Sequence, residues 1–472
     1  MVPTIPTDIQ PTIYRLDRLV ETSDAFSAFL DTDYPILLES ALNTPHGRYS
    51  YITADPFAVI RSKKNSVEIC GTSRTRKLNE DPFHSVRQLL SQYVITRHPG
   101  GPPFQGGAIG YFAYEMGRHI ERLPLNTIDD LNLPEMVIGL YDWVLAIDHQ
   151  ANERWICATG LPSGANEEAG KRIEWVKNRL YSHKPDSAIK MTNTSAAVSP
   201  RSNFTRCSYK TAVQTVKDYL AAGDVYQVNL SQRFQAETEL DAWSLYRRLG
   251  KVSPAPFASY LGFPDATVIS SSPEQFLKLD GDLVTTRPMK GTRPRGSTPT
   301  EDAQLVEDLQ TSPKDRAENV MIVDLLRNDL GKVCVPGSVQ VSELFIAEMY
   351  PTVHQMVSEI RGQVDTSHDL IDVLRACFPG GSVTGAPKIR AMEIIDELEP
   401  IERSVYCGAI GYLGFDGSMQ VSIPIRTLVM KDTRVFFSVG GGIVADSDPD
   451  DEYEETLHKA SGIFGALGSN LA

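Results

Sequence analysis

The chain has 472 residues, of which 41% are hydrophobic and 22% are charged, and these proportions are ordinary for a globular protein. Its 60 acidic and 46 basic residues give a formal net charge of −14, which argues against a surface that binds nucleic acid or an anionic membrane. No run of about 18 apolar residues occurs, and Met1–Tyr14 lacks the pattern of a signal peptide. The six cysteines are far apart and form no CxxC pair, which favours free thiols over a zinc site or disulfides. We therefore expect a cytoplasmic protein.

Residues 1–185 are expected to form an N-terminal region of strands with a few helices, because short apolar runs alternate there with Gly and Pro turns. From Lys184 to Asn203 the chain is rich in Ser, Thr, Pro and Asn and has no sustained apolar period. We therefore place a linker at 186–203 and a second region at 204–472. The clearest strand-like runs of the first region are Tyr34–Ser40, Gly106–Tyr114 and Met136–Asp148.

The second region mixes strands with longer helices. Ser312-Pro313 provides an N-cap and a first-turn proline for a helix through about Asn328. Further helices are expected from Gly385 to about Leu398 and from near Asp448 onward. Strands joined largely by hairpins, with a few long helices, predict an α/β (α+β) fold. The expected strands are Thr267–Lys278, Leu283–Lys290, Gly408–Phe415, Val421–Val429 and Val435–Val439.

The last helix carries two distinct faces. Glu452, Glu455 and Lys459 recur at helical spacing and form a stripe well away from the apolar face. This stripe can be a solvated surface, with a Glu455–Lys459 pair worth only about 0.3 kcal/mol. Alternatively, its two carboxylates can bind a hard cation beside an ammonium that attracts an anionic substrate. The apolar face consists of Tyr453, Leu457, Ala460, Phe464 and Leu467.

The helix that starts at Ser312 places Glu318 close to its apolar side, next to Met321 and Ile322. A carboxylate in such a position is costly unless it is paired or bound to a metal. Glu318 can flank the core and pair with an arginine. Mg²⁺ takes one or two carboxylates and completes its shell with water and substrate oxygens, so Glu318 and Glu455 from separate helices also suit this ion.

Two glycine-rich segments could bring backbone close to a ligand. Gly380–Lys388 is a turn that leads into a helix, where free N–H groups favour an anion. Gly440–Gly442 follows a strand and could approach a ligand equally closely. Neither segment has the spacing of a P-loop or a dinucleotide fingerprint.

Arg287–Gly296 is dense in cations and contains Lys290. A lysine near several arginines is disfavoured as ammonium, so we expect its pKa to fall and its amine to become nucleophilic; the alternative is a solvated basic loop. A two-residue turn at Asp280-Gly281 would pair Glu274 with Arg287 and direct Lys290 to the other face, although Pro273 and Pro288 are expected to interrupt that register.

Ordered motifs along most of the chain resemble the chorismate-utilising enzymes, which include anthranilate, aminodeoxychorismate, isochorismate and salicylate synthases. The matching segments of the second region cover about residue 204 to the end. They are Gly223–Gln232, Ser272–Glu274, Arg287–Gly296, Asp315–Asn319, Gly381–Lys388 and Glu452–Lys459. In the first region they are Leu37–Ser40, Gly47–Ser50 and Phe104–Gly107.

The resemblance implies two large facing, largely antiparallel sheets that form a sandwich with helices outside, as in anthranilate synthase. It implies Mg²⁺ at Glu318 and Glu455, with Glu452 as a further possible ligand, and a general acid at Glu274 that protonates the departing C4 hydroxyl of chorismate. The positions that match substrate contacts are His354, Thr384, Tyr406, Arg426, Gly441, Gly442 and Lys459. Glu39, Ser40 and Tyr49 match the tryptophan-binding part of anthranilate synthase.

Two positions separate the branches of the family. Gln227 stands where the isochorismate and salicylate branch has a lysine base, and glutamine cannot activate water. Lys290 stands where the anthranilate branch has a small residue and the aminodeoxychorismate branch has lysine. The resemblance therefore implies that the Lys290 amine attacks C2 of chorismate and that ammonia then attacks C4 and expels the lysine.

No glutamine amidotransferase segment with a nucleophilic cysteine is evident, so we expect ammonia from a separate amidotransferase subunit in a heterodimer. The expected product, 4-amino-4-deoxychorismate, leads to p-aminobenzoate and folate. Two alternatives stay open at this point. One is an anthranilate synthase component I, and the other is a non-catalytic protein that binds chorismate or tryptophan.

Overall fold

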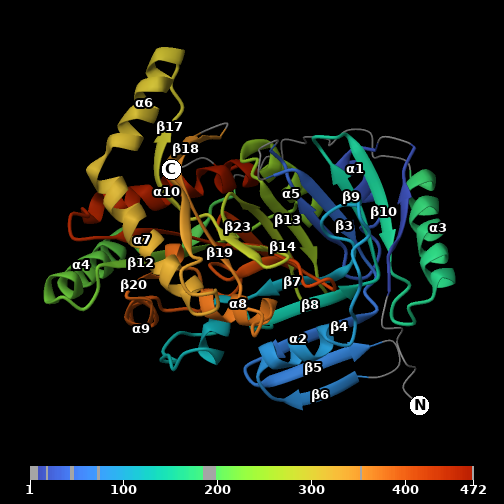
Figure 1. Cartoon of the computed structure of the whole chain (residues 1–472). Coiled ribbons are helices and arrows are strands. Elements are labelled where there is room, and N and C mark those ends of the chain that lie inside the picture. The colour runs from blue at the N-terminus through green and yellow to red at the C-terminus, as the bar shows by residue number, and fades with distance from the viewer. Residues whose placement is uncertain are drawn as a thin grey trace.

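The computed structural model describes residues 9–17, 20–42, 47–71, 75–183, 198–350 and 353–469. Two large sheets, of twelve strands each, make up its centre, and every strand pair within them is antiparallel. Helices pack on the outside (Figure 1). The predicted sandwich of two antiparallel sheets is therefore confirmed.

The first sheet has the order β1 (Thr12–Arg15), β10 (Glu153–Ala158), β9 (Trp143–Asp148), β3 (Tyr49–Thr53), β2 (Ile36–Glu39), β13 (Phe257–Gly262), β14 (Thr267–Ser272), β23 (Thr427–Lys431), β24 (Arg434–Ile443), β12 (Gln227–Glu237) and β11 (Arg201–Ser202), and β20 (Gly385–Ala386) pairs with β12. The second has the order β17 (Met289–Pro294), β19 (Val353–Gln363), β16 (Leu283–Thr286), β15 (Gln275–Asp280), β22 (Met419–Ser422), β21 (Ala409–Gly414), β7 (Gly107–Phe112), β8 (Met136–Tyr141), β4 (Ala58–Lys63), β5 (Ser66–Gly71) and β6 (Thr75–Asn79), and β18 (Gln340–Met349) pairs with β19.

The helices are α1 (Thr22–Ser27), α2 (Pro82–Leu90), α3 (Asn166–Ser182), α4 (Arg206–Ala222), α5 (Ala242–Val252), α6 (Pro299–Thr311), α7 (Pro313–Gly331), α8 (Leu370–Cys377), α9 (Lys388–Leu398) and α10 (Pro449–Leu467), with 3₁₀ turns at η1 (Tyr114–His119) and η2 (Gly381–Val383). None of the helices in the described ranges has both the length and the hydrophobicity that a membrane span requires.

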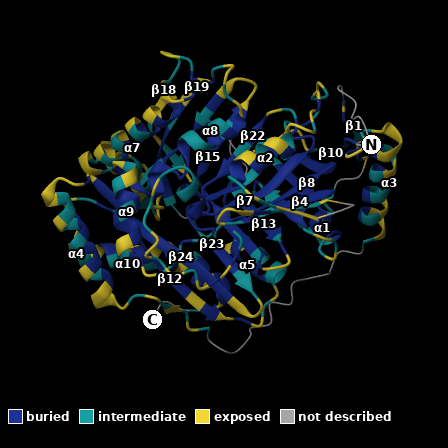
Figure 2. Ribbon diagram, turned by 90° about the horizontal axis from the view of Figure 1, so that it is seen from below, coloured by how far each residue is buried: buried dark blue, intermediate teal, exposed yellow. Residues whose placement is uncertain are grey.

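Three apolar layers hold the sandwich together, and Figure 2 shows the buried strands at the centre with exposed residues on the outer faces of the helices. One layer lies between the sheets and includes Ile109 and Val144. A second lies under α2, α7, α8 and α9, and a third lies under α1, α3, α5 and α10. The predicted apolar side of α10 is largely confirmed, because Ala460, Phe464 and Leu467 are buried in the third layer.

Both sheets combine strands from the two sides of the predicted linker. Among the described strands, β1–β10 occupy one part of each sheet and the later strands the other part, as the colours in Figure 1 show. The junctions are β2 with β13 in the first sheet and β21 with β7 in the second. Of the predicted linker 186–203, only 198–203 lies within the described residues, so the division into regions stays a prediction.

The chain crosses between the sheets at two adjacent places that matter for the site. It leaves β14 of the first sheet and enters β15 of the second at Pro273-Glu274, and it returns from β22 to β23 through 423–426. The crossings are bonded to each other, because the Ile423 N–H donates to the Glu274 carbonyl oxygen at 3.1 Å. The expectation of continuous strands over Thr267–Lys278 and Val421–Val429 was therefore wrong, since Pro273 and Pro424 interrupt both.

The hairpin between β15 and β16 turns at Gly281 and Asp282, because Asp280 pairs with Leu283. The predicted turn at Asp280-Gly281 was wrong by one residue; Gly281 adopts φ 62°, which suits glycine at the first turn position. If this register is continued, Glu274 lies opposite Met289 rather than Arg287. However, β17 pairs with β19 and not with β15, so the register of the β15–β16 hairpin does not determine the direction of the Lys290 side chain.

Candidate active site

Lys290 lies on β17 and points toward the glycine-rich turn at η2. Its Nζ donates a hydrogen bond to the Ser382 carbonyl oxygen at 3.1 Å. Part of the side chain is accessible, but protein atoms surround the ammonium, and this burial lowers the pKa of Lys290 below its usual value. Glu318 acts in the opposite direction, and Lys459 adds to the lowering. The amine is therefore easier to deprotonate than a solvated lysine, as a nucleophile requires.

The expected cause of this shift was wrong. The arginines of the cation-dense segment are all engaged with carboxylates and are not among the groups that shift Lys290. Arg287 pairs with Glu343, Glu348 and Glu359, while Arg293 and Arg295 pair with aspartates of α6 and α7. Burial, rather than arginine repulsion, lowers the pKa of Lys290.

Glu274 lies at the first crossing between the sheets and is only 3% exposed. Burial raises its pKa to about 7, while the Ser382 hydroxyl, Lys290 and the Met289 N–H limit the rise. The Ser382 Oγ donates to Glu274 Oε1 at 2.6 Å. A carboxyl group that keeps its proton near neutral pH is suited to act as a general acid.

Ser382 brings the two predicted catalytic groups together, because it accepts from Lys290 through its carbonyl and donates to Glu274 through its hydroxyl. Sequence reasoning missed this residue, although it lies inside the Gly380–Lys388 motif. Arg403 holds the turn that carries Ser382 in place. Arg403 donates to the Val383 carbonyl oxygen at 2.9 Å and to Glu399 at 2.8 Å, and nothing in the sequence pattern indicated this buried brace.

Carboxylates of α7 and α10 also lie close enough to Lys290 to act on its charge. Glu318 is half-buried, and its pKa is raised by burial; Lys290 lowers it and Glu455 raises it. Glu455 pairs with Lys459 at 2.6 Å, and Lys459 holds the pKa of Glu455 below its usual range. Glu452 is 5% exposed, and its Oε1 accepts from the Ser447 hydroxyl at 2.5 Å.

This donor set fits a hard cation. A Cβ at Gly441 would lie 3.0 Å from Glu452 Oε2 and 3.5 Å from Glu455 Oε1, so the two carboxylates converge on bare backbone. In the described ranges no three His, Cys, Asp or Glu side chains already form a metal-binding group. Mg²⁺ needs only one or two protein carboxylates, however, because water and substrate supply its remaining oxygens.

Gly442 provides space beside Lys290. A Cβ at this position would lie 1.9 Å from Gln227 Nε2 and 3.3 Å from Lys290 Nζ, so any side chain here would collide with Gln227. Lys459 donates to the Gly440 carbonyl oxygen at 3.0 Å and thereby fixes the same stretch of β24. The structure thus brings Lys290, Gln227, Gly442 and Lys459 together.

The other predicted substrate contacts are buried (His354, Thr384 and Tyr406) or half-buried (Arg426), and they differ in their partners. The Thr384 hydroxyl donates to the Gly380 carbonyl oxygen at 3.0 Å, and Tyr406 lies 5.9 Å from the Arg403 guanidinium. His354 Nε2 lies 2.7 Å from Asp302 Oδ1. Arg426 lies at the second crossing between the sheets, where burial lowers its pKa and Tyr350, rather than a carboxylate, is the group that raises it. Such a guanidinium is suited to bind a substrate carboxylate.

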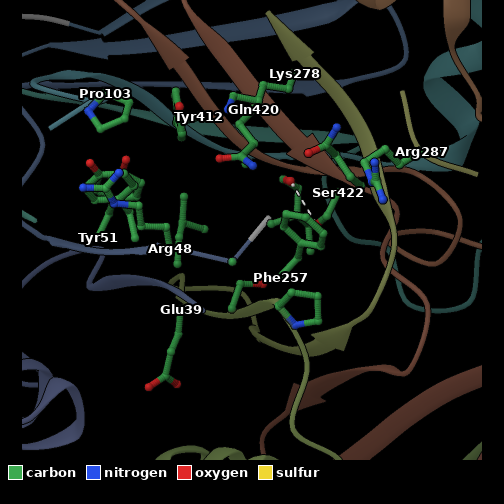
Figure 3. Close-up of a pocket in the computed structure, with 18 of the residues that line it drawn as sticks. Glu39, Arg48, Tyr51, Pro103, Phe257, Lys278, Arg287, Tyr412, Gln420 and Ser422 are labelled. Atoms are coloured by element: carbon green, nitrogen blue, oxygen red, sulfur yellow. Dashed lines mark hydrogen bonds between the residues drawn. The ribbon is translucent and has the colours of Figure 1, made fainter. Parts of the chain in front are cut away.

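The predicted tryptophan-binding residues border a separate cavity of about 500 Å³ between the sheets. Glu39 and Tyr49 line it, together with Gln275 and Arg287 of the second sheet, whereas Ser40 bonds to Ser50 and Leu42. Figure 3 shows the Glu39 carboxylate directed away from the other labelled residues, and it accepts from the Tyr246 hydroxyl. Gln275, which lines this cavity, is the residue after Glu274 in the chain.

The fold and site have clear relatives. The family model described as chorismate binding enzyme matches residues 36–465. The chain is 45% identical over 424 residues to aminodeoxychorismate synthase component 1 of Salmonella typhimurium, covering 90% of each chain. It is 42% identical over 444 residues to the same component of Escherichia coli, covering 94% of this chain and 95% of that protein. The crystal structure of anthranilate synthase component I from Streptococcus pneumoniae aligns with a TM-score of 0.80 at 30% identity, covering 90% and 93%. The chain belongs to the chorismate-binding enzyme family.

Proposed function

We propose that the chain converts chorismate and ammonia to 4-amino-4-deoxychorismate, for the synthesis of p-aminobenzoate and folate. Two relatives at 42–45% identity carry the name aminodeoxychorismate synthase component 1. The observation that carries the proposal is the pair of a buried lysine and a buried carboxyl group on opposite sides of Ser382. A nucleophilic amine and a proton donor are the two groups that this reaction needs.

The reaction proceeds in two balanced displacements. The neutral Lys290 amine forms a bond to C2 while both conjugated ring double bonds shift and the C4–O bond breaks, and Glu274 gives its proton to the departing hydroxyl, which leaves as water; the adduct nitrogen keeps its two protons as a secondary ammonium. Ammonia then bonds to C4, both double bonds shift back, and the C2–N bond breaks to release Lys290 as a neutral amine. The new ammonium returns a proton to the Glu274 carboxylate.

The carboxylates at the other end of the site are proposed to hold Mg²⁺, with Glu318 and Glu455 as ligands and Glu452 as a third. When bound, this ion supplies positive charge that balances a carboxylate of chorismate. Arg426 is proposed to bind a substrate carboxylate, and Lys459 and the Gly441-Gly442 backbone to orient one. His354, Thr384 and Tyr406 are proposed to surround the ring and the leaving hydroxyl.

The nitrogen source is proposed to be a glutamine amidotransferase subunit that forms a heterodimer with this chain in the cytoplasm. The printed name "component 1" of the relatives supports a second component. Tryptophan is proposed to bind in the cavity beside Glu39, Ser40 and Tyr49, where lining aromatic and polar groups would suit its ring and its charged end.

The test uses the isolated chain with Mg²⁺, chorismate and ammonium as the nitrogen donor. We expect a product that a lyase converts to p-aminobenzoate, and no fluorescent anthranilate. Anthranilate as the main product would favour the anthranilate synthase alternative. Absence of any product, with chorismate still bound, would favour a non-catalytic binding protein.

A further inference from the structure

Two buried amide side chains face the site without hydrogen-bond partners for their oxygens. Gln227 and Asn229 are 1% and 7% exposed, and they project from the same face of β12 because they are two residues apart. Within the described residues, Gln227 Oε1 and Asn229 Oδ1 accept no hydrogen bond. Leaving a buried acceptor unsatisfied costs about 1–3 kcal/mol, so two neighbouring ones indicate a ligand that donates.

Hydrogen bonds hold the backbone of Asn229 in place, so local mobility does not explain why its side-chain oxygen has no partner. The Asn229 N–H donates to the Thr384 carbonyl oxygen at 2.8 Å, and the Asn229 carbonyl oxygen accepts from Arg403 at 2.7 Å. Thr384 and Arg403 also fix the turn that carries Ser382. The amide oxygen of Asn229 is therefore fixed relative to Lys290 and Glu274.

The two amides lie over the glycines beside the nucleophile. A Cβ at Gly440 would lie 3.0 Å from Asn229 Oδ1, and the Cβ position of Gly442 is close to both Gln227 and Lys290 Nζ. Glycine at both positions lets the two amide side chains lie directly against the backbone of β24. A molecule held by the two amides would thus lie beside the Lys290 Nζ.

The missing ligand must donate hydrogen bonds, since both free atoms are acceptors. The carboxylates of chorismate only accept and its C4 hydroxyl donates a single hydrogen bond, so chorismate does not satisfy both oxygens at once. Ammonia matches, because it can donate two N–H bonds and keep its lone pair for attack on C4. We propose that Asn229 Oδ1, with Gln227 Oε1 as the second acceptor, binds and orients ammonia; this proposal rests on the proposed function.

The experiment compares Asn229→Leu with the wild-type chain, using ammonium as the nitrogen donor at a fixed pH. Leucine has a similar size but cannot accept a hydrogen bond. We expect the KM for ammonium to rise by about 10-fold, which corresponds to about 1.4 kcal/mol, with the KM for chorismate nearly unchanged. Formation of the Lys290–chorismate adduct without ammonium, followed by intact mass, should proceed at the wild-type rate. Gln235→Leu, at an exposed position of the same strand, is the matched control.

A rise in the KM for chorismate, or loss of the adduct in Asn229→Leu, would overturn the proposal, because Asn229 would then serve chorismate or the fold. An unchanged KM for ammonium would overturn it as well. Failure of the proposed function is recognised separately, since the wild-type chain itself would then form neither the adduct nor the C4-amino product.

Discussion

Lys290 and Glu274 are joined through one residue, since the Lys290 Nζ donates to the Ser382 carbonyl oxygen and the Ser382 hydroxyl donates to Glu274 Oε1. The proposed nucleophile and the proposed proton donor therefore both contact one residue of η2. A shift of this turn would move both groups at once, which links their distance from the substrate to the brace formed by Arg403.

Replacing the nucleophile should remove the chemistry. Lys290→Ala is expected to lower C4 amination by at least about 1,000-fold and to abolish the covalent adduct with chorismate. A lyase-coupled assay and intact mass spectrometry measure the two effects. Lys278→Ala, which removes a lysine from the wall of the separate cavity, should keep both. Unchanged product from Lys290→Ala would contradict the covalent mechanism.

The pH dependence should be bell-shaped. Glu274 acts as an acid, so kcat/KM for chorismate falls as the pH rises through its pKa of about 7. Lys290 acts as a neutral amine, so the rate also falls as the pH drops through its lowered pKa. Because the two groups interact, the apparent pKa values of the two limbs describe the coupled pair and not either residue alone. Glu274→Gln should lose the high-pH limb; a profile that keeps it would assign that limb to another group.

Ser382→Ala should act through Glu274 alone, because the Lys290 Nζ bonds to the Ser382 backbone carbonyl, which alanine keeps. The hydrogen bond from its hydroxyl lowers the pKa of Glu274, so the variant should shift the high-pH limb to higher pH. Misplacement of the acid should reduce kcat by about 10- to 100-fold. Ser382→Thr keeps a hydroxyl and should restore the position of the limb. A reduced kcat with an unshifted limb in Ser382→Ala would show that the hydroxyl does not tune Glu274.

Removal of the cation should stop the reaction reversibly. We expect EDTA to abolish product formation and added Mg²⁺ to restore it. Glu318→Gln and Glu455→Gln should each raise the Mg²⁺ concentration needed for half-maximal activity by at least about 10-fold. Glu454→Gln, on the same helix but paired with Arg206, is the control. An unchanged Mg²⁺ requirement in both variants would exclude these residues as ligands.

A buried carboxyl group outside the site should set the pH dependence of stability. Burial raises the pKa of Glu115 to about 8 from an ordinary 4.5. Between these values the unfolded chain releases a proton that the folded chain retains, so stability falls as the pH rises. Glu115→Gln keeps an acceptor for the Arg403 N–H and should gain in Tm over the wild type from about pH 5 to pH 8 by calorimetry. The exposed Glu307→Gln should show no such gain.

The sequence predicted much of the local structure, because caps and alternation are local properties. Ser312 caps α7 as expected, and α10 begins next to Asp448, close to the expected start; the sequence also indicates Lys290, Glu318 and Glu455 as candidate site residues. Long-range relations were missed. The passage of the chain between sheets at Pro273 depends on strand partners far away, and the role of Ser382 depends on contacts with residues about 100 positions earlier. The lowering of the Lys290 pKa by burial depends on the same packing.

Both sheets contain strands from the two sides of the predicted linker, so cutting the chain there would divide both sheets. Division at the linker would separate β2 from β13 and β7 from β21, which are interior pairs of their sheets. Each fragment would then present two long edges of unpaired backbone that the other fragment normally covers. Such fragments should recombine or aggregate rather than persist alone. Two pieces cut at the predicted linker are therefore expected to behave as a single folding unit.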